Sequence, residues 1–464
     1  MHRKALVIGA GSSGLAALSE LRSKGIDTVA IEARNDVGGQ WNFEAPGKCS
    51  VRFDEGGRCV VSAPGDENAG GPMPPTAMYE SLRCNVPTTL MAYRDEPFPY
   101  DTPLFPDAET VNAYLSTSAK SLRPHIIFNH RVISLRWTTP ADEGDQREWI
   151  CEYKSILERA TPKVEQFDFV VVANGHYTEP YIPLISGLDG WKGKIGHSRW
   201  YRDPEAYRDQ TVLVIGNSAS GYDITRQIAE PLFDRRSPDI PAESLPKIYQ
   251  SRKGPSSLGL PFDAPDSAEW AKAIGIFPPI ERIEGKTIWF EDGRSLNDVD
   301  LIMFATGHLY SFPFASPLHA PFTTHPLTIS PFPACSTPCP PGGLRVHNID
   351  RRQLFYLPSP TLSFLALPLL VIPFPLAQAQ SHLLAAFYSS SLPEPLKLEE
   401  GIPEDSEEER KGHVWGYPRE FDEQDLMLKE AGHGGDGGKW GRAENGRRDL
   451  RVGSMALRKA VLKY

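Results

Sequence analysis

Short apolar runs alternate with amphipathic segments at the start of the chain. Residues 5–8 are continuously apolar, which predicts a buried parallel strand, and Leu15, Leu18 and Leu21 recur at helical spacing. A second apolar strand is expected over residues 28–31. The order of strand, helix and strand predicts a βαβ unit here.

The same pattern returns near the middle of the chain. Residues 211–215 predict a strand, residues 222–228 an amphipathic helix, and residues 248–253 the end of a following strand. Further apolar strands are expected at residues 169–173 and 301–305, each followed by a polar residue and a glycine. We interpret these two strands as crossings between domains. Two βαβ openings about half a chain apart predict two nucleotide sites.

A glycine-rich turn follows the first strand. Gly9, Gly11 and Gly14 have the spacing Gly-x-Gly-x-x-Gly, and Ser13 lies within the turn. In such a turn the first glycine permits the tight bend, the second lets backbone approach a pyrophosphate, and the third lets the helix pack on the strand. Glu32 ends the next strand, where an acid binds a ribose hydroxyl pair. Because strand, helix and acid are in register, dinucleotide binding is favoured over a turn without a ligand.

A second glycine pair comes soon afterwards. Gly39, Gln40 and Trp41 follow Gly38 directly. Alone, this sequence is also typical of an ordinary turn with a buried tryptophan. After a dinucleotide unit, glycines let backbone lie close to a flat ring system, and Gln40 can bond flavin or ribose. We therefore favour a cofactor-binding role.

The second βαβ unit carries a looser version of the glycine turn. Gly216 and Gly221 keep their places, whereas Ser218 replaces the middle glycine and Ser220 precedes the last one. Serine still permits fairly close approach, and its hydroxyl can bond phosphate. This unit is therefore also expected to bind a dinucleotide.

The end of the following strand predicts which nicotinamide cofactor is used. Ser251, Arg252 and Lys253 stand where an acid would repel a 2′-phosphate. Two cations and a hydroxyl attract that group instead, so NADPH is expected. The alternative is a solvated basic turn.

Composition narrows the class of protein. The chain has 464 residues, a formal net charge of −10 and a pI near 5.7, so two or three domains are expected and a nucleic-acid partner is disfavoured. No leader-like segment precedes the first strand, and prolines interrupt the apolar run at 362–379, so we expect a cytoplasmic protein without a membrane anchor. The cysteines are scattered, so free thiols and no metal site are expected. They are Cys49, Cys59, Cys84, Cys151, Cys335 and Cys339.

Four segments do not read as regular structure. Residues 62–76 are rich in Gly and Pro and predict a surface loop, and residues 313–343 predict an irregular excursion. Residues 399–410 and 432–448 are expected to be exposed or partly disordered.

Residues 191–201, Trp-Lys-Gly-Lys-Ile-Gly-His-Ser-Arg-Trp-Tyr, fit the pattern aromatic-x-Gly-x-x-x-His-x-x-x-aromatic. With this motif the chain resembles the class B flavin-containing monooxygenases, in particular a soluble, microbial-type member of the N,N-dimethylaniline monooxygenase type, from Lys4 to about Gln380. Trp191 stands where Phe is usual. Tyr201 ends the motif where Baeyer–Villiger enzymes carry Trp followed by Pro or Asp, so the amine and sulfide branch fits better. We interpret His197 as part of a hinge between domains.

Three further segments carry the resemblance. Residues 79–87 resemble the segment whose asparagine faces the flavin, which implies that role for Asn85, although Asn85 also reads as a turn residue. Residues 304–308 resemble the Ala-Thr-Gly linker and place Thr306 and Gly307 at the cofactor, with His308 departing from the usual aromatic residue. Residues 360–380 resemble the stretch that returns to the flavin domain.

The resemblance implies an α/β fold with two Rossmann-like dinucleotide-binding domains. An NADP-binding domain at 177–308 would be inserted in a discontinuous FAD-binding domain made of residues 1–176 and 309–464. The implied activity uses FAD, NADPH and O₂ to oxygenate a soft nitrogen or sulfur atom of a small amine, thiol or sulfide through a C4a-(hydro)peroxyflavin. Asn85 would protect that oxygenated flavin. A homo-oligomer is compatible with the sequence.

Other activities are compatible with the same motifs. A Baeyer–Villiger or N-hydroxylating flavoenzyme has a similar layout. A pyridine-nucleotide disulfide reductase is disfavoured because no redox cysteine pair follows either glycine turn. Since fold does not fix function, the altered turn at Ser218 and the departure at His308 leave room for a catalytically weak NADPH-binding sensor or scaffold.

Overall fold

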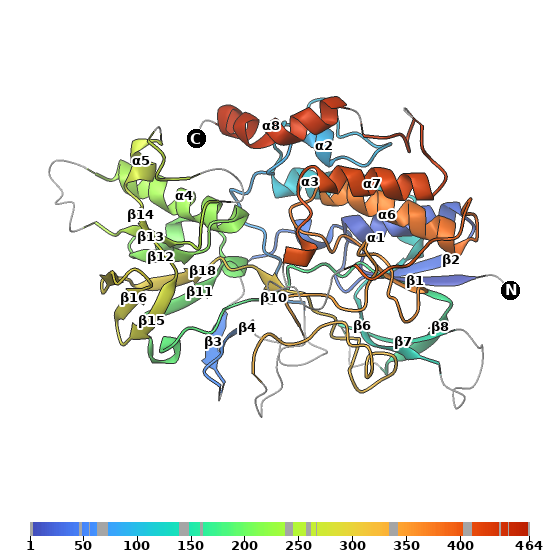
Figure 1. The fold of residues 1–464 in the computed structure, drawn as a ribbon, viewed down its shortest axis with the longest axis horizontal. Helices are drawn as coiled ribbons and strands as arrows, with labels where there is room; N and C mark the ends of the chain where they lie inside the picture. Colours follow the sequence, from blue (N-terminus) through green and yellow to red (C-terminus); the bar gives the residue numbers. More distant parts are fainter. Residues whose placement is uncertain are drawn as a thin grey trace.

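Two parallel β-sheets, each flanked by helices, organise the chain in the computed structural model (Figure 1). The elements that build them come from the ranges in which the structure is described. These are residues 3–45, 49–54, 56–62, 73–138, 148–157, 161–236, 245–256, 261–265, 267–333, 342–401, 411–435, 438–443 and 445–462.

The first sheet has the strand order β20-β9-β1-β2-β5, and every neighbouring pair in it is parallel. Its strands are β1 (Lys4–Ile8), β2 (Asp27–Ile31), β5 (Ile126–Ile127), β9 (Phe169–Val172) and β20 (Leu362–Phe364). Their residues are mostly apolar on both faces because both faces are covered.

Helices cover one face of this sheet and a small antiparallel sheet covers the other (Figure 1). Val7 packs with Leu15 of α1 and with residues of α6, whereas its neighbour Leu6 packs with Leu135 and Trp149 on the opposite face. Alternate residues of one strand therefore enter two different cores. The covering elements are α1 (Ser12–Ser23), α6 (Pro373–Tyr388), α7 (Arg419–Glu430), β6 (His130–Trp137), β7 (Trp149–Ser155) and β8 (Lys163–Phe167).

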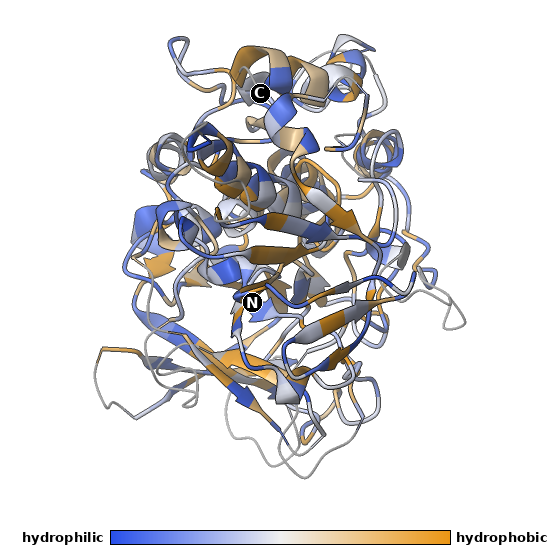
Figure 2. Cartoon of the chain, turned by 90° about the vertical axis from the view of Figure 1, so that its left-hand side faces the viewer, coloured by the Kyte–Doolittle hydropathy of each residue, from blue (hydrophilic) through white to orange (hydrophobic). Residues whose placement is uncertain are grey.

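The second sheet has the order β11-β18-β12-β13-β14 and is also parallel throughout. Val212 and Val214 pack against the helix α4, and Leu213 packs toward a second antiparallel sheet. In the view of Figure 2 strands in the middle carry many of the hydrophobic residues, whereas hydrophilic residues are more frequent in outer segments. The elements of this unit are β11 (Lys194–His197), β12 (Val212–Ile215), α4 (Ala219–Asp234), β13 (Ile248–Ser251), α5 (Glu269–Lys272), β14 (Gly275–Phe277), β15 (Ile280–Glu284), β16 (Thr287–Phe290), β17 (Ser295–Leu296) and β18 (Leu301–Phe304).

The chain passes between the two sheets along paired segments. β10 (Glu179–Pro180) follows β9, β19 (His308–Leu309) follows β18, and the two pair antiparallel with Glu179 opposite Leu309. All strands of the second sheet thus lie between β9 and β20 in the sequence. The predicted α/β fold with two Rossmann-like units is confirmed.

The remaining elements lie around these two units. The strands and α-helices are β3 (Ser50–Phe53), β4 (Cys59–Ser62), α2 (Thr88–Met91), α3 (Ala108–Ser118) and α8 (Asn445–Leu462). Short 3-10 helices are Gly39–Trp41, Arg123–His125, Leu188–Gly190, Ser198–Trp200, Glu205–Tyr207 and Lys411–His413.

The segments without a regular pattern have mixed outcomes. The apolar run at 362–379 splits into β20 and the buried helix α6, which has Pro373 in its first turn, and no described helix is long and apolar enough to cross a membrane. Residues 313–333 contain no helix or strand, as expected. The expectation for 432–448 holds only in part: residues 432, 434, 435, 438 and 439 are exposed, but Trp440 stacks on the buried His382, Ala443 is buried, and residues 445–448 begin the helix α8. Residues 63–72, 334–341 and 402–410 lie outside the described part.

Candidate dinucleotide sites and active site

The first and third glycines of the turn after β1 are required by the fold itself. Gly9 has φ +101°, and a Cβ there would lie 2.6 Å from the carbonyl oxygen of Ala173. A Cβ on Gly14 would overlap the carbonyl oxygen of Gly9. Both positions therefore exclude a side chain whether or not a ligand binds.

Gly11 has a different environment. It is the N-cap of α1 with φ −73°, and a Cβ there would meet backbone of Gly39 at 3.5 Å, which is ordinary contact. No side chain caps the helix, and its first turn contains no acid. The N-terminal N–H groups of α1 are thus available to an anion, and the structure fits the pyrophosphate of a dinucleotide.

Glu32 lies beneath this turn at the end of β2. Its side chain is buried, with one carboxylate oxygen accepting from the Ala10 N–H at 2.7 Å and the other from the Arg34 N–H at 2.8 Å. Burial raises the pKa of Glu32, while these N–H donors act to lower it. The carboxylate is fixed in place and keeps lone pairs that ribose hydroxyls can use.

The second glycine pair packs directly on the first turn. Gly38 has φ +108° and donates its N–H to the Ala10 carbonyl at 3.1 Å. A Cβ on Gly39, which has φ +55°, would come within 3.0 Å of the Gly11 Cα. The two glycine turns therefore form one surface of closely packed, partly buried backbone without side chains, which is the arrangement expected beside a flat cofactor.

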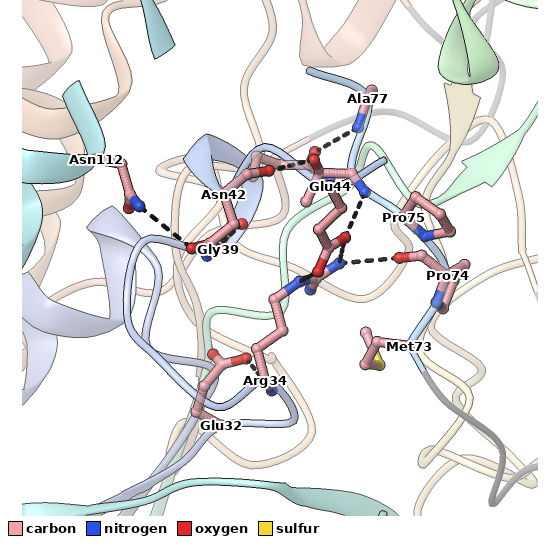
Figure 3. A network of polar contacts seen from close by, with 12 residues as sticks. Glu32, Arg34, Gly39, Asn42, Glu44, Met73, Pro74, Pro75, Ala77 and Asn112 are labelled. Atoms are coloured by element: carbon pink, nitrogen blue, oxygen red, sulfur yellow. Dashed lines mark hydrogen bonds and ion pairs between the residues drawn. The ribbon is translucent and has the colours of Figure 1, made fainter. Parts of the chain in front are cut away.

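Polar contacts connect this surface to the segment 73–77 (Figure 3). The Gln40 side-chain oxygen accepts from the Ala77 N–H at 3.3 Å. Arg34 pairs with Glu44 at 3.0 Å, and Glu44 accepts from the Thr76 N–H at 2.9 Å. The network fixes the carbonyl end of Gln40 and leaves its NH₂ group without a hydrogen bond to described residues.

Trp41 forms part of the wall behind the glycines. Its ring meets Phe374 of α6 edge to face, with centroids 6.1 Å apart. This half-buried position agrees with both readings of Trp41, as a core residue and as a neighbour of a cofactor.

The turn after β12 repeats the geometry of the first. Gly216 has φ +109°, and a Cβ there would lie 2.5 Å from the Ala305 carbonyl oxygen. A Cβ on Gly221 would overlap the Gly216 carbonyl oxygen. Ser218 is the N-cap of α4 with φ −80°, so serine causes no backbone strain there, and both Ser218 and Ser220 are exposed. This turn also fits a phosphate ligand.

The three residues at the end of β13 differ in how freely they could bind a 2′-phosphate. The buried hydroxyl of Ser251 donates to the Pro278 carbonyl at 2.8 Å. Arg252 pairs with Asp263 at 2.6 Å, an acid that sequence reasoning did not connect with this site. Lys253 is exposed and has no ion pair among the described residues. A 2′-phosphate would meet Lys253 freely but would share Arg252 with Asp263.

His197 connects the chain segments that cross between the two units. This histidine is fully buried, and its Nδ1 accepts from the Arg199 N–H at 3.2 Å. Nε2 must then carry the proton, which it donates to the Gly307 carbonyl at 2.9 Å. Thr306 donates its hydroxyl to the Tyr181 carbonyl, and the His308 ring meets the His197 ring edge to face at 5.2 Å. His197 thus has a structural role at the crossing, consistent with a hinge.

Asn85 lies in a segment that contacts both units. Its side chain is half-buried and makes no hydrogen bond to the described part of the chain. On one side, the Cys84 N–H donates to Pro106 at 3.0 Å within the first unit. On the other, the Tyr79 hydroxyl donates to Asp223 of α4 at 2.8 Å. The carboxamide of Asn85 thus has no hydrogen-bond partner among the described residues, in a segment that lies against both units.

Two Rossmann-like units whose glycine turns both fit a dinucleotide define the class of a two-dinucleotide oxidoreductase. A family model described as flavin-binding monooxygenase-like matches residues 67–232, and one described as an NAD(P)-binding Rossmann-like domain matches residues 7–69. The chain belongs to the flavin-containing monooxygenase family, on the evidence of the relatives that follow.

Flavin-containing monooxygenase FMO GS-OX-like 9 of Arabidopsis thaliana is 33% identical over 422 residues, covering 87% of this chain and 79% of the relative. The thiol-specific monooxygenase of Saccharomyces cerevisiae is 29% identical and covers 84% and 78%. The structure of S-allyl-L-cysteine S-oxygenase from Allium sativum superimposes with a TM-score of 0.74 at 26% identity, covering 99% of this chain and 93% of that one. The protein is therefore a monooxygenase that uses a flavin and a nicotinamide dinucleotide, as predicted.

Proposed function

We propose that this protein uses FAD and NADPH to oxygenate the sulfur atom of a small thiol or thioether. The observation that supports this most is the same glycine turn in both units, with Gly11 and Ser218 each forming the N-cap of a helix that no side chain caps. Sulfur is preferred over nitrogen because two of the similar proteins are described as thiol-specific and as an S-oxygenase.

FAD is proposed to bind the first unit, as the two contiguous glycine turns and the fixed carboxylate of Glu32 support. The residues assigned to it are Gly9, Gly11, Ser13, Gly14, Glu32, Gly39, Gln40 and Trp41. NADPH is assigned to the second unit, with Lys253 as the most available partner of its 2′-phosphate. The residues assigned to NADPH are Gly216, Ser218, Ser220, Gly221, Ser251, Arg252, Lys253, Thr306 and Gly307. The pairing of β10 with β19 supports domain boundaries near residues 177 and 308.

The bound cofactors supply the chemistry: electrons from NADPH pass to FAD, which activates O₂ for transfer of one oxygen atom to the nucleophile. The protein must orient the two cofactors and keep water and stray protons away from the reacting atoms. Asn85 suits this task because its carboxamide does not titrate and can offer a fixed hydrogen bond. A cytoplasmic location completes the proposal, since the described cysteines are free thiols.

Replacement of Asn85 tests the active-site assignment. Asn85→Ala should retain FAD and its reduction by NADPH, because other residues bind the cofactors. A larger share of the NADPH oxidised should appear as hydrogen peroxide in place of oxygenated product. Stopped-flow absorbance and a peroxide assay measure both quantities, and Asn297→Ala, which alters an exposed asparagine, is the matched control. If Asn85→Ala converts the same share of the oxidised NADPH into oxygenated product as the wild type does, Asn85 is a turn residue and has no role in the active site.

The substrate class is tested separately with ¹⁸O₂. A thiol, a thioether, a tertiary amine, a primary amine and a ketone are offered in parallel, and the products are analysed by mass spectrometry. We expect one ¹⁸O atom on sulfur. Predominant N-oxide or hydroxylamine formation would assign the enzyme to amines, and an ester product from the ketone would make it a Baeyer–Villiger enzyme.

A further inference from the structure

The last helix of the described chain, α8, lies over the segment that carries Asn85 (Figure 1). Its Arg458 is only 1% exposed, an unusual degree of burial for an arginine. The guanidinium donates from Nε to the Cys84 carbonyl at 2.9 Å and from Nη2 to the Arg83 carbonyl at 3.1 Å. These are the two residues immediately before Asn85.

A second arginine of α8 holds the other side of the same segment. Arg447 donates to the carbonyls of Thr89 and Leu90 at 3.0 and 3.3 Å, and these residues belong to α2, which begins soon after Asn85. The two arginines are about three helical turns apart, roughly 16 Å along the axis. Carbonyl groups on both sides of Asn85 are therefore bound to one rigid element.

The helix α8 is itself fixed to the first unit. Arg448 pairs with Asp425 of α7 at 2.6 Å, and both side chains are largely buried. Arg451 pairs with the fully buried Glu420 of α7 at 2.5 Å. Ion pairs with so little solvent exposure restrain the helix more than surface pairs do. The position of α8 is thus set by the packed core beneath α7.

Arg458 also reaches the second unit. Its Nη2 lies 3.3 Å from the Asp223 carboxylate of α4, and the Tyr79 hydroxyl donates to the same oxygen. One turn further along α4, Gln227 accepts from the Ser81 hydroxyl at 2.6 Å. The segment before Asn85 therefore lies against the helix whose N-terminus is the second glycine turn, and Arg458 contacts both.

We propose that Arg458 is a positioning residue for Asn85, which it holds at a fixed place between the two dinucleotide units. The planar guanidinium can bind two consecutive carbonyls and a carboxylate at once, and an ammonium group cannot reproduce that fork. Fixing the Arg83 and Cys84 carbonyls fixes the peptide that enters Asn85. The inference rests on the proposed role of Asn85.

The test compares Arg458→Met, Arg458→Lys, Asn85→Ala and the double variant Arg458→Met/Asn85→Ala. Val452→Ala, at an exposed position of α8, is the control. Each variant is measured for bound FAD, flavin reduction by NADPH and the ratio of hydrogen peroxide to NADPH. Hydrogen exchange of the apoprotein supplies a readout that does not depend on activity.

Arg458→Met should raise the peroxide ratio several-fold with flavin reduction unchanged, and Arg458→Lys should have an intermediate ratio. The double variant should be no worse than Asn85→Ala, because both changes act through one side chain. Amide exchange should become faster over residues 79–91 and stay unchanged over β6 and β7. If Arg458→Met does not yield folded protein, the peroxide ratio and amide exchange of Arg458→Lys alone test the inference.

Two results would overturn the inference and a third separates it from the proposed function. The inference would be overturned if both Arg458 variants had the same ratio of hydrogen peroxide to NADPH as Val452→Ala. It would also be overturned if the peroxide ratio of the double variant reflected the sum of the effects of the two single changes. If Asn85→Ala is uncoupled while the Arg458 variants are not, the inference fails and the role of Asn85 stands. If Asn85→Ala is fully coupled, the role of Asn85 and the inference fail together.

Discussion

Substitution of Gly11 is expected to affect FAD binding without affecting folding, in contrast to substitution of Gly14. A methyl group at Gly14 would overlap the Gly9 carbonyl oxygen, so Gly14→Ala should prevent correct folding of the first unit. A methyl group at Gly11 would lie in ordinary contact with Gly39, at a backbone conformation that any residue adopts. Gly11→Ala should therefore preserve the apoprotein and impair FAD binding alone.

The two expected effects differ strongly in size. In the apoprotein, the entropic gain from replacing glycine with alanine, about 0.4–1 kcal/mol, is offset by the poorer N-cap propensity of alanine. The free energy of unfolding should thus change by less than about 1 kcal/mol. In the complex, loss of one charge-assisted bond from a backbone N–H to the pyrophosphate costs about 1.5–3 kcal/mol. This cost corresponds to a roughly 10- to 150-fold rise in the Kd for FAD.

Thermal unfolding of the apoprotein and fluorescence titration with FAD measure the two quantities. Gly190→Ala is the matched control, because a Cβ at Gly190 has no neighbour within 4 Å. If Gly11→Ala binds FAD as the wild type does, backbone at Gly11 does not approach the pyrophosphate and the assignment of this turn is refuted. A large loss of apoprotein stability would instead make Gly11 a structural residue like Gly14.

Further predictions concern the nicotinamide cofactor and pH. Lys253→Ala should raise the KM for NADPH by roughly tenfold, because it removes the free energy of one charge-assisted hydrogen bond to phosphate, and should leave the KM for NADH unchanged. Equal use of both cofactors by the wild type would refute this prediction. Asp263→Asn should lower the KM for NADPH by up to about fivefold, because the half-exposed pair with Arg252 is worth about 0.2–1 kcal/mol and its loss frees the guanidinium; an unchanged or higher KM would contradict it. Burial lowers the pKa of His413 to about 3, so the folded protein keeps this ring neutral while the unfolded chain protonates it below about 6.5. The free energy of unfolding should therefore fall by about 1.6 kcal/mol between pH 6.5 and pH 5, as measured by urea unfolding, and His413→Gln should lose that part of the dependence.

The sequence alone predicted those features that depend on neighbours in the chain. The strands at residues 5–8 and 211–215 and the turns that follow them are set by local apolar runs and by glycine conformation, and both appear as predicted. The parallel arrangement follows from the βαβ connection. The crossing strands at 169–173 and 301–305 could likewise be located, because a polar residue and a glycine end each one.

Only the tertiary structure decided which distant groups share a site. The carbonyls of Ala173 and Ala305, which forbid a side chain at the first glycine of each turn, come from strands far along the chain. Arg458 binds Cys84 because the last helix packs against the segment before Asn85, and 374 residues separate the two partners. Asp263 pairs with Arg252 because the chain after β13 folds back within the second unit. Local propensity carries no information about such contacts, since they form only after the loop-closure entropy of the intervening chain has been overcome by burial of the core.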